Sequence, residues 1–206
     1  MSSPINIGLL GGTFDPVHWG HLRVAEAVAD KLGLSKVKLV TAARPPHKQR
    51  DVLSAEHRHA MVEAAVEGLP GFEACRLELD LGISYTIDLV KHLLSENPDG
   101  SLVKHSFITS AEYLNPENQS NLRTWKGSEE LLSLINMVVT TRGDLTVAVA
   151  EKWAAQLKLP NLQIVEIPYI PVSSGVVKDA LRTGQNIEKL VPPGVADLIK
   201  RHGHYR

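Results

Sequence analysis

The stretch that decides the fold, GGTFDPVHWGHL, spans residues 11–22. It follows an apolar run, Ile5 to Leu10, of the kind found in buried parallel strands. It leads into Gly20 to Leu32, where apolar residues recur with the helical period until Gly33 ends the pattern. A second strand pattern, Val37 to Ala42, comes next. We therefore predict a strand–helix–strand unit with this stretch at the turn between its first strand and its helix.

The rest of the chain continues to alternate between strand and helix patterns. Prolines and charged side chains make residues 44–50 a predicted surface loop. Further strands are expected over Phe72–Leu79, Leu102–Ile108, Asn136–Thr140 and Leu162–Ile167. Further helices are expected over Ser54–Val66, Ser84–Leu94, Glu129–Leu134, Leu145–Leu157, Gly175–Arg182 and Gly194–Arg201. The alternation predicts an α/β fold: a doubly wound, Rossmann-like, mostly parallel sheet with helices on both faces. We expect one domain over residues 1–206, with 173–206 as a small C-terminal helical part.

The composition is that of a globular protein. Of 206 residues, 43% are hydrophobic and 22% charged, which disfavours disorder and fibrous folds. The net charge of −1 provides no long-range field for nucleic acid or an anionic membrane, so we expect neither as a partner. The single Cys75 fits a reducing compartment, and no apolar run reaches the length of a membrane span. These features predict a cytoplasmic protein, and a homo-oligomer is compatible with them.

The 11–22 stretch is placed to hold an anion. In sheets of this type, ligands bind at the carboxyl ends of the strands. Gly11 and Gly12 allow positive φ and a close approach of phosphate to backbone N–H groups, and the helix start adds further donors. The stretch matches neither a GxGxxG dinucleotide motif nor a GxxxxGK[ST] phosphate loop. Redox cofactors and phosphate-loop chemistry therefore lose support.

Two histidines distinguish this stretch from other anion sites. His18 and His21 are three residues apart, on one face of the first helical turn. A zinc site would need further ligands at standard spacing, so we expect no metal ligands here. Capping of the helix start is the ordinary explanation for either histidine alone. The pair beside a Gly-Gly sequence favours phosphate chemistry instead.

The sequence His18-Trp19-Gly20-His21 resembles the motif of the HxGH nucleotidyltransferases. The resemblance implies that a phosphate nucleophile attacks the α-phosphorus of a nucleoside triphosphate and that pyrophosphate leaves, without a covalent enzyme intermediate. His18 and His21 would then be the catalytic residues, donating to phosphate oxygens and stabilising the transition state rather than acting as bases. The residues assigned to ATP binding in this stretch are Gly11, Gly12, Thr13, Phe14 and Gly20.

Over nearly its full length the chain is similar to the bacterial nicotinate-nucleotide adenylyltransferases. The similarity rests on five ordered segments: residues 11–22, RPPHK (44–48), SYTIDLV (84–90), Trp125 with EELL (129–132), and VVTTRG (138–143). It implies AMP transfer from ATP to nicotinate mononucleotide, with magnesium accompanying ATP. The implied substrate-binding residues are Asp15, His47, Lys48, Tyr85, Thr86, Trp125 and Arg142.

Each of these residues also has an ordinary structural explanation. His47 and Lys48 can supply positive charge to a phosphate or lie in a solvated basic loop. Tyr85 and Thr86 can offer donors to a carboxylate, whereas Ser84 can simply cap a helix. Trp125 can stack on a pyridine ring or belong to the core. Asp15 can orient magnesium through water or brace its loop.

The chain departs from the family pattern at the positions expected to bind ATP. Ser173 and Ser174 match a C-terminal ISSTxIR-like motif, but Gly175 replaces a threonine and Lys178 an arginine. Ser106 and Glu112 are also assigned to ATP; at residues 110–112, Ser-Ala-Glu stands where Gly-Ala-Asp is usual. Two alternatives stay open. The acceptor can be nicotinamide mononucleotide or phosphopantetheine, or the protein can be a nucleotide-binding regulator without turnover.

Overall fold

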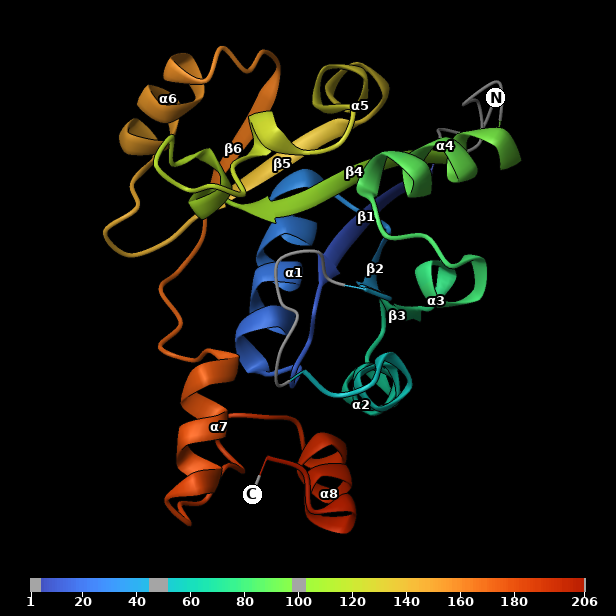
Figure 1. Ribbon diagram of the computed structural model, residues 1–206, viewed down its shortest axis with the longest axis vertical. Coiled ribbons are helices and arrows are strands. Elements are labelled where there is room, and N and C mark those ends of the chain that lie inside the picture. The colour runs from blue at the N-terminus through green and yellow to red at the C-terminus, as the bar shows by residue number, and fades with distance from the viewer. Residues whose placement is uncertain (1–4, 45–51, 98–102, 206) are drawn as a thin grey trace.

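The computed structural model describes residues 5–44, 52–97 and 103–205. Its centre is a sheet in which every described strand pairing is parallel. The strands are β1 (Ile5–Gly12), β2 (Lys36–Thr41), β3 (Phe72–Cys75), β4 (Val103–Ser110), β5 (Asn136–Thr141) and β6 (Leu162–Glu166). Their order across the sheet is β3-β2-β1-β4-β5-β6 (Figure 1). The predicted doubly wound α/β sheet is confirmed, and its described strands are all parallel rather than mostly so.

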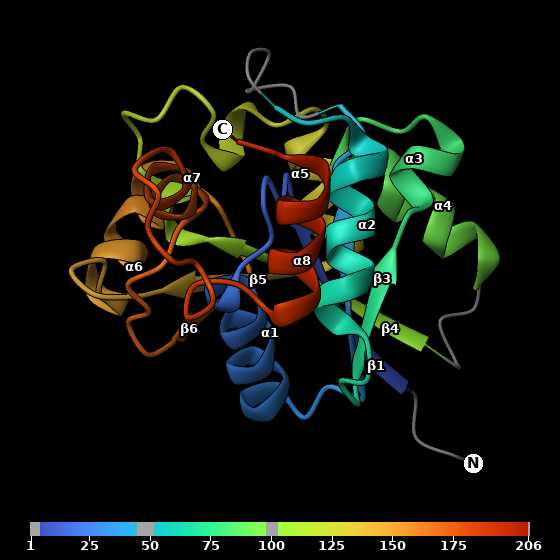
Figure 2. The same ribbon diagram turned by 90° about the horizontal axis from the view of Figure 1, so that it is seen from below.

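Helices cover both faces of this sheet. They are α1 (Trp19–Leu32), α2 (Ala55–Val66), α3 (Leu77–Leu81), α4 (Thr86–Glu96), α5 (Ser128–Leu134), α6 (Val147–Gln156), α7 (Ser174–Arg182) and α8 (Pro193–His202), with 3-10 turns at Ala111–Leu114 and Leu122–Thr124. Apolar side chains of α1, α2, α7 and α8 share one core cluster, and those of α4, α5 and α6 share the other. Figure 2 shows α8 alongside α2. None of the described helices is long and apolar enough to cross a membrane.

The central strand explains where a ligand site can form. β1 lies between β2 and β4, with Leu10 in register with Leu39 on one side and Ile108 on the other. Because the chain reverses the direction of winding between β1 and β4, their carboxyl ends open a crevice between the helical layers. The 11–22 stretch leaves β1 at this crevice.

The structure corrects two local predictions. The pattern at Phe72–Leu79 predicted one strand, but β3 ends at Cys75 and the chain turns into α3, which Gly82 ends in the left-handed conformation. An Arg76–Asp80 ion pair spans this short helix, and Glu78 faces the interior. A short alternating pattern cannot distinguish one strand over Phe72–Leu79 from a shorter strand followed by a helix.

Gly11 and Gly12 are also not in a turn. Both are the last residues of β1, and neither has a positive φ; the residue that does is Phe14, at 49°. The reason for glycine is space. A Cβ on Gly11 would lie 2.7 Å from the Phe107 ring, and one on Gly12 would lie 2.7 Å from the Phe14 ring.

A buried arginine connects the loops around the crevice. Arg58 of α2 is 1% exposed. Its guanidinium donates to the carbonyl oxygens of Thr13 at 2.6 Å, Ala42 at 2.7 Å and Leu53 at 2.9 Å. One side chain thereby provides donors for partly buried carbonyl oxygens at the ends of β1 and β2 and before α2.

We predict that Arg58→Met lowers the free energy of unfolding by about 3 kcal/mol, because several buried carbonyls lose a charged donor while the apolar stem is kept. Urea unfolding followed by circular dichroism measures this. The matched control is Arg23→Met, which removes an exposed arginine paired with Glu26 on α1 and should change stability by less than about 0.5 kcal/mol. Equal effects of the two substitutions would contradict this role of Arg58.

Candidate active site

The two histidines of the 11–22 stretch meet at the start of α1. His18 is the N-cap residue of the helix, and its ring stacks on that of His21, with centroids 3.7 Å apart and planes 28° apart. The His18 backbone N–H donates to Nδ1 of His21 at 3.2 Å. Because Nδ1 accepts, the N–H of a neutral His21 ring is on Nε2. The pair therefore caps the helix and also aligns two imidazoles at the crevice.

The electrostatics of His18 suit a neutral donor. Burial, together with the nearby positive charge of Arg142, lowers the pKa of His18 to about 4. The residue is 4% exposed, and its Nδ1 atom is buried with no hydrogen-bond partner among the described residues. At neutral pH the ring is uncharged, so it can donate one N–H to a phosphate oxygen without being a general acid.

Gly20 allows the histidine pair to lie against the segment that enters α7. A Cβ on Gly20 would lie 2.8 Å from the His18 ring and 3.1 Å from the Val172 carbonyl oxygen. The amino end of α7 follows directly. Ser173 caps this helix by accepting from the Val176 N–H at 3.2 Å, and Ser174 Oγ donates to the Pro16 carbonyl oxygen at 3.0 Å. Both serines of the C-terminal motif thus border the 11–22 stretch.

One cavity beside the histidines has the features of a nucleoside site. It measures about 560 Å³ and includes Glu112, Arg142 and Ser173 in its lining. A guanidinium nitrogen of Arg142 lies 3.6 Å from a carboxylate oxygen of Glu112. Its walls thus combine a carboxylate, a guanidinium and the amino end of α7, which are groups that can bind hydroxyls and phosphates.

A second cavity of about 370 Å³ is lined in part by the 11–22 stretch itself. Its lining contains residues from the 11–22 stretch, the start of α4 and the segment before α5. Trp125 donates from Nε1 to the Ser120 carbonyl oxygen at 3.0 Å and meets the Tyr113 ring edge-on at 5.3 Å. The predicted site residues in the lining of this cavity are Gly11, Gly12, Thr13, Phe14, His21, Tyr85, Thr86, Trp125 and Ser174.

The start of α4 faces this second cavity without a capping side chain. Tyr85, not Ser84, is the N-cap residue, and no side chain in the described part of the protein accepts its capping hydrogen bond. Capping by Ser84 was therefore not the reason for that motif. An uncapped helix start in a cavity wall offers backbone N–H donors and partial positive charge to a carboxylate.

The two charged residues of the second cavity, Lys126 and Glu78, were not predicted from the sequence. Lys126 Nζ lies 4.6 Å from the centre of the Tyr85 ring and pairs with Asp88. Glu78 of α3 accepts from the Ala43 N–H at 3.2 Å, and burial raises its pKa to about 7. Lys126 directly follows Trp125, which is a usable signal. Glu78 was missed because its segment was predicted to be a strand.

Asp15 and Lys178 form an ion pair between the 11–22 stretch and α7. The Asp15 side chain is 4% exposed and also accepts from the Leu53 N–H at 3.3 Å. These contacts are those of a side chain that braces its loop. In the described parts of the chain, no three His, Cys, Asp or Glu side chains are grouped to hold a metal ion.

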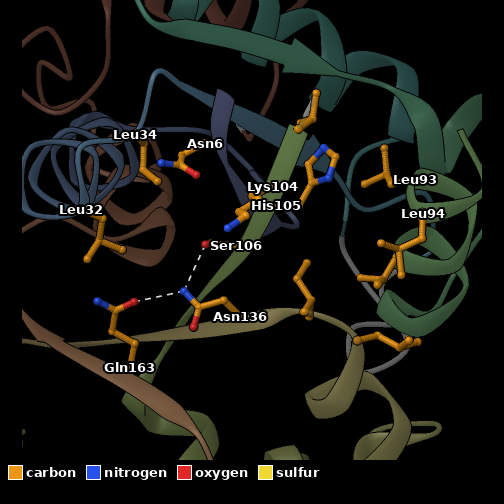
Figure 3. A pocket seen from close by; sticks show the side chains of 14 residues that line it. Asn6, Leu32, Leu34, Leu93, Leu94, Lys104, His105, Ser106, Asn136 and Gln163 are labelled. Atoms are coloured by element: carbon orange, nitrogen blue, oxygen red, sulfur yellow. Dashed lines mark hydrogen bonds between the residues drawn. The ribbon is translucent and has the colours of Figure 1, made fainter. Parts of the chain in front are cut away.

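One predicted residue, Ser106, is not brought to this site. It lies in the middle of β4, paired in register with Gly8. Figure 3 shows it in a separate pocket, where it accepts a hydrogen bond from Asn136. Strand direction explains this, since only the carboxyl end of β4 reaches the crevice. His47 and Lys48 lie outside the described residues.

Comparison with known proteins agrees with this geometry. The model of the cytidylyltransferase-like family matches residues 9–180, which include both histidines, both cavities and most of α7. The chain belongs to this family of nucleotidyltransferases.

Curated relatives narrow the classification within that family. A protein of Rubrobacter xylanophilus, "Probable nicotinate-nucleotide adenylyltransferase", is 37% identical over 98% of this chain and 92% of its own. A protein of Bordetella avium with the same name is 34% identical over 97% of this chain and 98% of its own. The chain is therefore a member of the nicotinate-nucleotide adenylyltransferases. Plasmodium falciparum nicotinic acid mononucleotide adenylyltransferase complexed with APC shares the fold, with a TM-score of 0.75 at 19% identity over 98% of this chain and 97% of that one.

We predict that Gly20→Ala lowers the free energy of unfolding by about 1–3 kcal/mol, because the added methyl displaces the His18 ring or the Val172 carbonyl. The matched control is Gly175→Ala, at the start of α7, where the nearest atom to a Cβ would be Ser173 Oγ at 3.6 Å. There we expect no loss and a gain of up to about 1 kcal/mol. Urea unfolding compares the two; a Gly20→Ala protein as stable as Gly175→Ala would contradict the close contact.

We also predict a pH dependence caused by His18. Its pKa is about 4 in the folded protein and about 6.5 in the unfolded chain. Below pH 6.5 the unfolded chain therefore binds a proton that the folded protein does not, and the unfolding free energy falls as the pH drops toward 4. His18→Asn should remove on the order of 3 kcal/mol of this loss between pH 7 and 4. Identical pH profiles for wild type and His18→Asn would refute the assignment.

Proposed function

We propose that this protein transfers the AMP moiety of ATP to nicotinate mononucleotide, giving nicotinate adenine dinucleotide and pyrophosphate, as a step of NAD synthesis. One observation carries the proposal: two imidazoles stack at a helix start, where His21 lines a cavity suited to a carboxylated ring and Gly20 lies against Val172, which lines a cavity suited to a nucleoside. The names of the relatives, at 33–37% identity, support the same acceptor.

The proposed reaction is a single in-line displacement at phosphorus. A phosphate oxygen of nicotinate mononucleotide forms a bond to the α-phosphorus of ATP while the bond to the oxygen bridging the β-phosphate breaks. Pyrophosphate leaves with that electron pair. His18 and His21 each donate an N–H to phosphate oxygens, where negative charge increases in the transition state. Binding in the two cavities brings the reacting atoms together, which replaces much of the entropic cost of the reaction.

On the acceptor side, the proposal assigns the second cavity to the nicotinate nucleotide. Trp125 would stack on the pyridine ring, and the backbone and hydroxyl donors of Tyr85 and Thr86 would bind its carboxylate. Lys126 adds positive charge at the same wall. His47 and Lys48 remain proposed contacts for the acceptor phosphate. A cavity with a cation and an uncapped helix start favours a carboxylate over the neutral amide of nicotinamide mononucleotide.

On the ATP side, the proposal assigns adenosine to the cavity of Glu112 and Arg142. Glu112 would accept from ribose hydroxyls, and Arg142 and Lys178 would supply positive charge to the phosphates. Magnesium would enter with ATP and offset the negative charge of its phosphates. The protein needs to contribute few ligands to that ion, which suits an Asp15 side chain already engaged by Lys178 and Leu53.

The proposed setting is metabolic. The substrates are small molecules, and no nucleic acid or membrane is involved. We expect the enzyme to work in the cytoplasm, given its single cysteine.

Pyrophosphate release from ATP, magnesium and pure protein tests the proposal, with nicotinate mononucleotide, nicotinamide mononucleotide and phosphopantetheine as parallel acceptors. We expect the highest kcat/KM with nicotinate mononucleotide. His18→Ala and His21→Ala should each lower kcat by about 100-fold or more, since each removes a transition-state donor. His92→Ala is the control and should retain full activity.

Each other outcome has a distinct meaning. Faster turnover with another acceptor would change the assigned substrate. ATP binding with no turnover on any acceptor would indicate a nucleotide-binding regulator. If the histidine variants lost thermal stability but kept the wild-type kcat, the role of the pair would be limited to capping the helix.

A further inference from the structure

The buried carboxylate of Asp15 accepts a hydrogen bond from a tyrosine side chain to which the proposed reaction assigns no role. Tyr205, 190 residues further along the chain, donates its hydroxyl to Oδ1 of Asp15 at 2.7 Å. This hydrogen bond is shorter than the one that the same oxygen accepts from the Leu53 N–H, at 3.3 Å. The other carboxylate oxygen, Oδ2, faces Lys178.

Tyr205 contacts both members of this ion pair. Besides the hydroxyl on Asp15, the face of its ring lies under the ammonium of Lys178, with Nζ 5.0 Å from the ring centre. A cation over an aromatic face is attracted to it, more strongly where water is excluded. The side chain of Lys178 is 19% exposed and that of Asp15 is 4% exposed, so the ion pair is largely shielded from water.

The segment that carries Tyr205 is held in place independently of this contact. Gly203 ends α8 in the left-handed conformation, and the His204 N–H donates to the Ile199 carbonyl oxygen. The Tyr205 ring also packs against the core cluster shared by α1, α2, α7 and α8. The hydroxyl is therefore presented to Asp15 by a fixed backbone, as positioning of another group requires.

We infer that Tyr205 is a positioning residue for ATP binding: it fixes Asp15 and Lys178 relative to each other, and so aligns the 11–22 stretch with the amino end of α7. The inference rests on the proposed function for the role of Lys178 at the phosphates. Without the hydroxyl, Asp15 loses a hydrogen bond of the strong, charge-assisted kind. The carboxylate then binds Lys178 with fewer competitors, and the ammonium is less available to a phosphate.

The test is a double-mutant cycle with Tyr205→Phe, which removes only the hydroxyl, and Lys178→Met. The dissociation constants of ATP with magnesium, and separately of nicotinate mononucleotide, are measured by calorimetry without the second substrate. Tyr205→Phe should weaken ATP binding about tenfold, as expected for loss of a hydrogen bond to a charged group. It should leave nicotinate mononucleotide binding unchanged and have no further effect on ATP in the Lys178→Met background.

The control is His202→Ala, in the same segment, which should bind ATP as the wild type does. ATP binding by Tyr205→Phe equal to wild type would overturn the inference. So would equal weakening in both Lys178 backgrounds, or equal weakening for both ligands, since these indicate general loosening. Wild-type protein that does not bind ATP would refute the proposed function instead. In that case the same cycle measured by urea unfolding decides the inference, because additive losses would show that Tyr205 and Lys178 are not coupled.

Discussion

The buried carboxylate of Asp15 is the constraint around which the site is arranged. A charge with 4% exposure is stable only when it is paired and hydrogen-bonded. Its partners come from three separated parts of the chain: the backbone before α2, the side chain of Lys178 on α7, and the hydroxyl of Tyr205 after α8. Satisfying this one group therefore fixes how the C-terminal helices sit against the first loop.

At His18, close to Asp15 in the sequence, burial instead favours an uncharged side chain. His18 is as buried as Asp15, but it has no carboxylate partner among the described residues and lies near the positive charge of Arg142, so its pKa falls to about 4 and the ring is neutral. The protein thus places a structural carboxylate beside an uncharged donor. In the proposed reaction this division is useful, because a neutral imidazole that donates to a phosphate does not first have to be desolvated as an ion.

Much of this could be predicted from the sequence because it is local. The strand before Gly11, the helix after His18 and the spacing of the histidines all follow from short-range periodicity. Family motifs then located the serines of α7 and the residues around Trp125.

What could not be predicted depends on distant neighbours. The Phe107 ring leaves room only for glycine at position 11. Arg58 has a structural role because it donates to carbonyl oxygens of separate loops. Similarly, Ser106 has a suitable side chain but lies in the middle of its strand, away from the carboxyl end that reaches the crevice. In each case the deciding contact is made across the sheet or between layers, where sequence spacing carries no information.

The separation between Asp15 and Tyr205 also bears on how the protein is made. Synthesis is vectorial, and the loop of Asp15 leaves the ribosome long before the tyrosine that completes its hydrogen bonding has been added. Until then the nascent chain can assemble the sheet but must keep that carboxylate hydrated. Contacts between residues so far apart in the sequence form late in folding. Shortened chains that stop before α8 would be held in this state, with their central strands paired and the first loop still open to water.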